Sequence, residues 1–195
     1  MRTIQAVLLS LIILPAMAQQ DDLPYYQIPD YPETYSSGNI LSRMVDGLGY
    51  RYYWASESLT QANLDYKPSD DARSTFETLQ HLYGLSETIM NAAQNQPNVR
   101  PLDWSEMTYE DLRQATLHQL QKASELYSAL SEEELAQAKV IFLNGDNRFE
   151  APLWNMMNGP IADALTHVGQ VVSFRRASGN PINPKVNVFM GRTGN

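Results

Sequence analysis

The sequence predicts an all-α protein, a four-helix bundle with a long crossover between its third and fourth helices. Four long segments carry apolar residues at the 3.6-residue period of an amphipathic helix. Capping residues, Gly and Pro punctuate these segments at plausible helix ends. The connection before the last helical segment is long and irregular, as in bundles that contain one crossover connection. An extended N-terminal arm and a C-terminal tail complete the predicted architecture.

The first eighteen residues have the pattern of a secretory signal peptide. Arg2 supplies a positive charge, residues 6–15 are mostly apolar, and residues 16–18 read Ala-Met-Ala, a small-residue cleavage site. We therefore expect an exported protein, periplasmic or extracellular. No later run approaches the ~20 apolar residues of a membrane helix, so we expect no membrane span.

The first half of the mature chain predicts an arm and two helices. Residues 19–36 are rich in Pro and Tyr, which favours an extended arm wrapped over the core. The first helix is expected from about Ser37 to Leu59. Pro68 and the polar residues after it indicate a stop and a new N-cap, with a second helix over about 70–93. Residues 95–104 are expected to form a loop.

The second half predicts two further helices around a crossover. Thr108 and Asp111 resemble a capping box and open a third helix that ends near Leu130. A second box at Ser131 opens a short helical segment. A hairpin is expected over 140–150, because the Asn-Gly at 144–145 favours a tight turn.

The last helix is expected from Pro152 to Gly179, and Gly159-Pro160 predicts a kink within it. The bundle thus spans 37–179, and residues 180–195 form the tail.

Composition excludes several classes of protein. The net charge is −8, whereas nucleic-acid binding needs a basic face. The chain has no cysteine, so no disulfide stabilises it and no thiol serves as a nucleophile. Stability must come from one ordinary apolar core. A small-molecule substrate and a homodimer are both compatible with this composition.

Asp163 and His167 form the most informative pair in the sequence. Four residues apart, they lie on one face of the last helix. Ala164 and Val171 fall within about 60° of His167, so we expect the carboxylate and the imidazole to point into the protein. A buried carboxylate needs compensation, which a metal ion, a proton or a basic neighbour would each provide.

The chain has two other histidines. His118 points away from the apolar stripe of its helix, which indicates a solvated side chain. His81 lies at the edge of the stripe on the second helix, where a hydrogen-bonded structural histidine is as compatible with the pattern as a metal ligand.

Two motifs together resemble the DinB/YfiT-like superfamily of four-helix-bundle metalloproteins. They are residues 74–82, Ser-Thr-Phe-Glu-Thr-Leu-Gln-His-Leu, and residues 163–170, Asp-Ala-Leu-Thr-His-Val-Gly-Gln. The segment 175–181 is similar to that of an exported subgroup. The resemblance implies one ligand on the second helix and a His-xxx-His pair on the last. It therefore implies a metal site of His81, Asp163 and His167, with Asp163 replacing the first histidine of the pair.

Such a site suits Zn, Ni, Fe or Mn and leaves a coordination position open. The resemblance implies a thiol S-transferase or isomerase, but export disfavours the thiol reaction because reduced thiols are a cytosolic resource. A metal-activated water is then the more natural nucleophile, which favours a metal-dependent hydrolase. Two alternatives remain. One is a non-catalytic exported bundle that binds a metal or a partner. The other is a structural Asp163–His167 pair, with the arm as a contact surface. A cleft beside the site would favour the enzyme.

Overall fold

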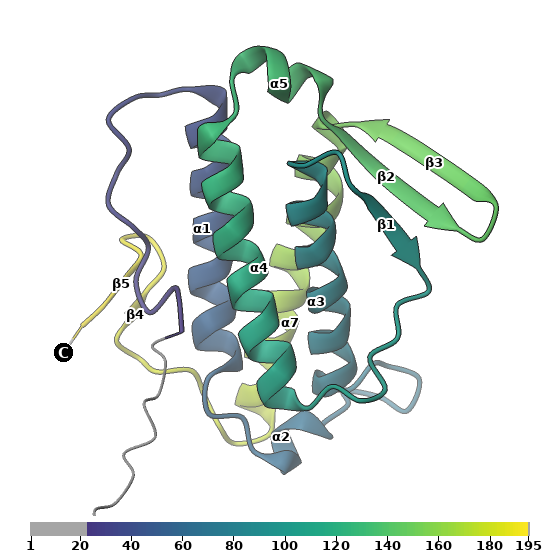
Figure 1. The fold of residues 1–195 in the computed structure, drawn as a ribbon. Helices are drawn as coiled ribbons and strands as arrows, with labels where there is room; N and C mark the ends of the chain where they lie inside the picture. The colour runs from purple at the N-terminus through teal and green to yellow at the C-terminus, as the bar shows by residue number, and fades with distance from the viewer. Residues whose placement is uncertain (1–22, 195) are drawn as a thin grey trace, which may run out of the picture.

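The computed structural model describes residues 23–194, so the predicted signal peptide and the start of the arm lie outside the described residues. Its framework is four long helices (Figure 1). These are α1 (Ser37–Ser56), α3 (Thr75–Ala92), α4 (Tyr109–Ala129) and α7 (Ala162–Ala177). Around the bundle they follow the order α1, α4, α3, α7, and each packs against its two neighbours. Within this part of the chain no helix combines the length and apolar content that a bilayer crossing requires.

Local capping explains where three helices begin. Ser74 and Glu77 form a capping box at the start of α3, as Thr108 and Asp111 do for α4 and Ser131 and Glu134 for the short α5 (Glu132–Gln137). The boxes predicted at α4 and α5 are confirmed. The second predicted helix starts later than residue 70, because the box at Ser74 is the stronger start signal.

Two predicted helices are interrupted. The first ends at Ser56, and a separate one-turn helix, α2 (Gln61–Leu64), follows. The last opens as α6 (Trp154–Met156) and a π-helical turn, η1 (Met157–Ile161), before α7. Gly159 leaves helical geometry at φ −96° and ψ −107°, directly before Pro160. The predicted kink is thus confirmed as a restart of the helix, and α7 takes its own direction.

The all-α expectation is incomplete, because two small sheets accompany the helices. β2 (Lys139–Asn144) and β3 (Asn147–Pro152) form the predicted hairpin, whose turn is centred one residue later than expected. β1 (Pro97–Arg100), expected as loop, pairs in parallel with β2. Two short strands of two residues each, β4 (Val186–Asn187) and β5 (Arg192–Thr193), pair as an antiparallel hairpin in the expected tail.

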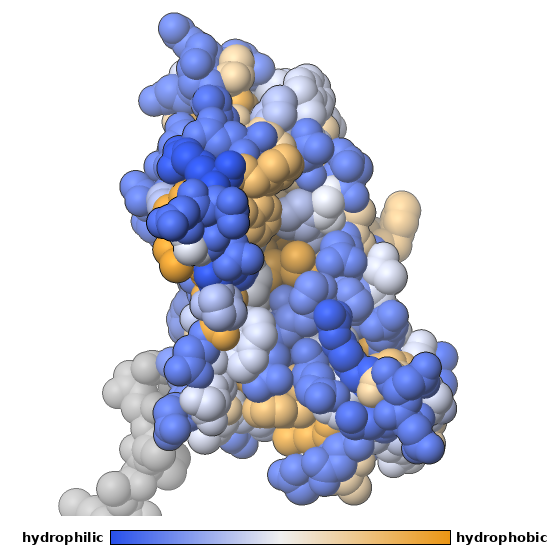
Figure 2. All heavy atoms as spheres, turned by 90° about the vertical axis from the view of Figure 1, so that its right-hand side faces the viewer, coloured by the Kyte–Doolittle hydropathy of each residue, from blue (hydrophilic) through white to orange (hydrophobic). Residues whose placement is uncertain are grey.

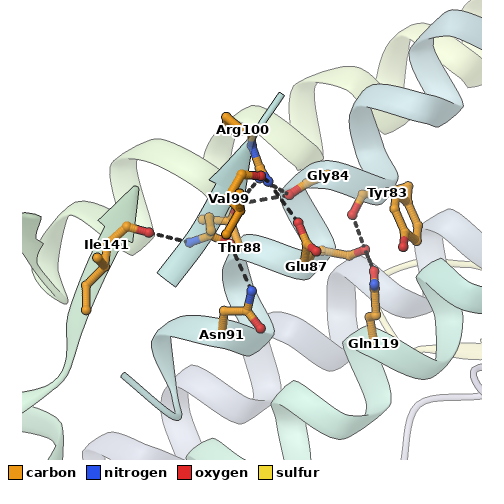
Figure 3. Close-up of polar contacts among 11 residues, drawn as sticks. Tyr83, Gly84, Glu87, Thr88, Asn91, Val99, Arg100, Gln119 and Ile141 are labelled. Carbon is orange, nitrogen blue, oxygen red and sulfur yellow. Dashed lines mark hydrogen bonds and ion pairs between the residues drawn. The ribbon is translucent and has the colours of Figure 1, made fainter. Parts of the chain in front are cut away.

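Side-chain hydrogen bonds fasten β1 to α3 (Figure 3). Arg100 donates to Glu87 at 2.9 Å, to the hydroxyl of Thr88 at 3.1 Å and to the carbonyl of Gly84 at 3.3 Å. The buried Asn98 amide donates to the Ile141 carbonyl at 2.9 Å and so ties β1 to β2. The hairpin β2–β3 projects from the bundle on this side, and this face is largely hydrophilic with apolar patches between polar regions (Figure 2).

The arm and the C-terminal segment pack together against α1. The ring of Tyr25 lies on Gly49, where a Cβ would approach it within 2.4 Å, and its hydroxyl donates to Asp46 at 3.0 Å. Burial raises the pKa of the Asp46 carboxyl. The backbone N–H of Ile28 donates to the Gly191 carbonyl at 3.0 Å. Residues near both ends of the described chain thus form one layer over α1.

Arg175 joins the C-terminal ends of α1 and α7, which run in the same direction (Figure 1). Its side chain is only 2% exposed. The guanidinium donates to the carbonyls of Trp54 at 2.7 Å and Ala55 at 3.1 Å, and to that of Asn180 at 2.7 Å. The last carbonyls of a helix lack intrahelical partners, so Arg175 satisfies two such groups on the neighbouring helix.

Replacing Arg175 by Met should lower the free energy of unfolding by about 2–4 kcal/mol, because two buried carbonyls lose their partner. Arg176→Met is the matched control, since Arg176 is exposed and its favourable position at the helix end is worth less than about 1 kcal/mol. Urea unfolding followed by circular dichroism measures both. If both variants lost the same free energy of unfolding, the buried hydrogen bonds of Arg175 would contribute nothing beyond the effect of a positive charge at the helix end.

Candidate metal centre

Three side chains from α3 and α7 converge on one point. His81 Nε2 lies 3.1 Å from Asp163 Oδ2, and His167 Nε2 lies 3.3 Å from Asp163 Oδ1. The two imidazoles meet edge to face with ring centroids 4.5 Å apart. One ligand atom from each residue lies within 4.8 Å of the others, so the cluster could hold a metal ion. The structure thus brings together the three residues that the sequence singles out.

The spacing fits a divalent cation. A tetrahedral ion with ligand bonds of about 2.0–2.2 Å places neighbouring ligand atoms about 3.3–3.6 Å apart. The distances of 3.1 and 3.3 Å from the two imidazoles to the Asp163 carboxylate are close to that range. One carboxylate and two imidazoles also form a donor set of the kind that Zn and other transition metals accept.

Local structure places each of the three cluster residues. The capping box of Ser74 and Glu77 fixes the start of α3, so His81 stands about two turns into a well-defined helix. The break at Gly159-Pro160 sets the start of α7, and Asp163 and His167 follow in its first two turns. Because α3 and α7 are neighbours in the bundle, these turns face each other.

The cluster lies at the edge of the core, and the expectation that Asp163 points into the protein is wrong. Side-chain exposure is 44% for Asp163, 30% for His81 and 15% for His167. α7 packs against both α1 and α3. The residues that it buries therefore lie closer to α1 around the helix axis than Asp163 and His167 do. These buried residues are Ala164, Val168, Val171 and Arg175. A ligand held by these three residues would therefore be accessible from solvent.

Gln170 orients the imidazole of His167. Its side-chain oxygen lies 2.7 Å from His167 Nδ1. In the neutral ring this oxygen accepts the Nδ1 proton, which leaves a lone pair on Nε2 directed at the Asp163 carboxylate. The Nε2 lone pair of His167 and a carboxylate oxygen of Asp163 then face each other and repel. A cation bound between these two acceptors would remove the repulsion. This is the arrangement by which a neighbouring carbonyl group orients a histidine for metal binding.

Burial lowers the pKa of the His81 imidazole below its ordinary value of 6.5. The hydrogen bond to Asp163 acts in the opposite direction, and the positive charge of Arg73 lowers the pKa further. The ring is therefore mostly neutral at pH 7, which is the state that binds a metal.

Glu77 does not support His81, although it lies one turn earlier on α3. Its carboxylate accepts from the Ser74 N–H at 2.6 Å and pairs with Lys67 at 3.2 Å. It is a helix cap, a role that the Ser-x-x-Glu spacing of Ser74 and Glu77 in the sequence signals. The third histidine, His118, is exposed on α4 as expected.

A cleft opens beside the N-terminal end of α3. It has a volume of about 660 Å³ and lies between α2, α3 and the start of α4. Phe76, Glu77 and Tyr109 are among its lining residues, and His81 follows Glu77 by one helical turn. The lining of the cleft includes none of the three cluster residues.

Comparison with known proteins supports the fold. No family model matches the chain. No curated protein matches it. Among solved structures, YfiT from Bacillus subtilis, described as a probable metal-dependent hydrolase with an unusual four-helix bundle topology, aligns with a TM-score of 0.50 and 18% sequence identity. The match covers 77% of this chain and 94% of YfiT. The match shows that this chain shares the four-helix-bundle fold of YfiT.

In metal-free protein, the His81 pKa should be below 6.5, and Asp163→Asn should lower it further, because the carboxylate is the group that raises it. NMR titration of the imidazole C–H resonances measures both values. Asp146→Asn in the hairpin turn is the control and should leave the His81 titration unchanged. A higher His81 pKa in Asp163→Asn would contradict this account of the pair.

Proposed function

We propose that the protein binds one divalent metal ion through His81, Asp163 and His167 and acts as a metal-dependent hydrolase. The observation that carries the proposal is the convergence of the three ligand atoms within 4.8 Å of one another, from two helices. A lone histidine–aspartate hydrogen bond needs no second imidazole, whereas a metal site uses all three groups.

Water is the favoured nucleophile. A divalent ion held at this site would lower the pKa of a bound water and so supply hydroxide near neutral pH. The protein's own contribution is to keep His81 neutral, to orient His167 through Gln170 and to leave the cluster open to solvent. YfiT, whose fold this chain shares, is itself described as a probable hydrolase.

Export supports hydrolysis over thiol transfer. The N-terminal signal pattern favours secretion, and low-molecular-weight thiols are scarce outside the cytosol. The proposal includes the long crossover formed by α5, β2 and β3. This crossover connects α4 to α7, the helix that carries Asp163 and His167.

A non-catalytic metal-binding bundle is the second candidate function. It is favoured by the fact that the residues lining the 660 Å³ cleft do not include His81, Asp163 or His167.

Elemental analysis of purified protein should find close to one Zn, Ni, Fe or Mn per chain. Asp163→Ala and His167→Ala should each lose most of it, because two ligands cannot hold the ion at comparable affinity. His118→Ala, an exposed histidine on α4, should retain the full content. If the wild-type protein contained no metal even after incubation with each ion, the proposed metal site would be refuted. Full metal content without hydrolysis of a panel of esters, amides and phosphoesters would favour the non-catalytic bundle.

Gln170→Ala should weaken metal binding by about tenfold or more, the usual effect of removing a hydrogen bond that orients a ligating imidazole. Competition with a chromophoric chelator measures the dissociation constant. Thr166→Ala is the control, because among residues 23–194 its hydroxyl bonds only to the Ala162 carbonyl of its own helix. Equal affinities for Gln170→Ala and wild type would show that the Gln170 contact does not position His167.

A further inference from the structure

A second cavity lies on the far side of α7 from the metal cluster. It is an open groove of about 780 Å³ between α1, α7 and the C-terminal segment 182–188. Figure 1 shows β4 and β5 beside α1, on the side of the bundle away from the hairpin β2–β3. The volume falls in the range of about 300–1,000 Å³ that is usual for small-molecule sites.

The chemistry of the groove is amphipathic. Val168 and Val172 of α7 lie along it, and Met44, Leu165 and Val188 add side chains that are 37%, 36% and 45% exposed. Its charged lining residues are Arg43 and Arg51, with no carboxylate among them. In a chain of net charge −8, a groove with only positive side chains is a local reversal of charge. It complements an anion attached to an apolar chain.

Arg51 is the more available of the two guanidinium groups. Arg43 donates to the Pro29 carbonyl at 2.8 Å and stacks over the ring of Tyr31, 4.7 Å from its centroid. Arg51 makes one hydrogen bond, at 3.0 Å, to the Gly47 carbonyl of its own helix, and no ion pair with any residue between 23 and 194. Four N–H groups of a half-buried guanidinium thus remain for a ligand, in a geometry that suits carboxylate or phosphate.

The wall of the groove is held in place before any ligand arrives. Ile182 and Val186 pack against a buried cluster of Ile28, Tyr50 and Trp54. The Tyr50 hydroxyl bonds to Thr193 at 2.9 Å, and Arg192 pairs with Asp30 at 2.7 Å. Binding therefore needs little ordering of the C-terminal segment, which favours affinity.

We propose that this groove binds an anionic amphiphile, a single acyl or alkyl chain with a carboxylate or phosphate head. The chain lies along Leu165 and Val172, and the head group accepts hydrogen bonds from Arg51. Gly169 leaves room beside this path, because a Cβ built there meets no atom within 4 Å. This binding site is separate from the metal cluster and does not depend on it.

Isothermal titration calorimetry with decanoate and decyl phosphate, below their micelle concentrations, tests the proposal and distinguishes the two head groups. At least one should bind with a stoichiometry of one, more weakly as salt is raised. Decanol should bind more weakly, and decyltrimethylammonium should not bind. Arg51→Gln should weaken the anionic ligand by about tenfold or more, the usual effect of losing a charge-assisted hydrogen bond.

Gly169→Leu should abolish binding by filling the groove, and replacing a helical glycine keeps or raises helix stability. Arg148→Gln, in the hairpin β2–β3, is the charge-matched control and should bind as wild type. Circular dichroism establishes that each variant is folded. No binding of either anion, or equal binding of the cationic amphiphile, would overturn the proposal. So would a dimer, seen by sedimentation, that Gly169→Leu or Arg51→Gln dissociates, because the groove would then be occupied by a second copy of the chain.

Discussion

The contact between Arg175 and the end of α1 is the interaction on which the site geometry depends. α1 and α7 are parallel, so the partial negative charges at two helix C-termini meet at the same end of the bundle. Arg175 places one positive charge between them and donates to carbonyls of both α1 and the segment after α7. These contacts fix the position of α7 along the bundle axis relative to α1. Asp163 lies twelve residues earlier on the same rigid helix, about 18 Å along its axis, so its position is fixed as well.

The other end of α7 is set by a different constraint. Gly159 and Pro160 interrupt the last helical segment, and α6 and η1 absorb the change in direction. Because the helix restarts at Ala162, α7 can lie between α1 and α3 with its first turns against His81. The kink and the arginine contact together determine where the cluster forms.

Signals carried by neighbouring residues made most of the fold predictable. The boxes at Thr108 and Ser131 and the Gly159-Pro160 break each depend on a few adjacent residues, and each is present. The hairpin is present too, but its two-residue turn is Gly145-Asp146 rather than the expected Asn144-Gly145. β1 was missed because its partner strand lies about forty residues later and pairs in parallel, which no local pattern encodes. The contacts of Arg175 are likewise not encoded by any local pattern. Its acceptors, Trp54 and Ala55, lie far away in the sequence.

In the candidate site, too, local contacts could be predicted from the sequence, whereas the packing between helices could not. The i, i+4 spacing correctly places Asp163 and His167 on one face, but the periodicity of a single helix could not say how that face is oriented between two neighbours. Periodicity alone left His81 at the edge of a stripe, and only the resemblance to a family placed it with the pair. The contact of Gln170 with His167 is an i, i+3 contact, within reach of sequence reasoning.

α7 presents two chemically different faces, and this follows from its position between α1 and α3. Asp163 and His167 point to the side of α3, whereas Leu165, Val168 and Val172 lie roughly 120–180° around the helix from the midpoint of the pair, on the side of α1. A helix packed against two neighbours needs a wide apolar surface. The polar cluster occupies one margin of that surface and the amphipathic groove the other. A ligand in the groove and a metal at the cluster would share the helix but no side chain, so any coupling between them would require movement of α7 as a whole, against the contacts of Arg175.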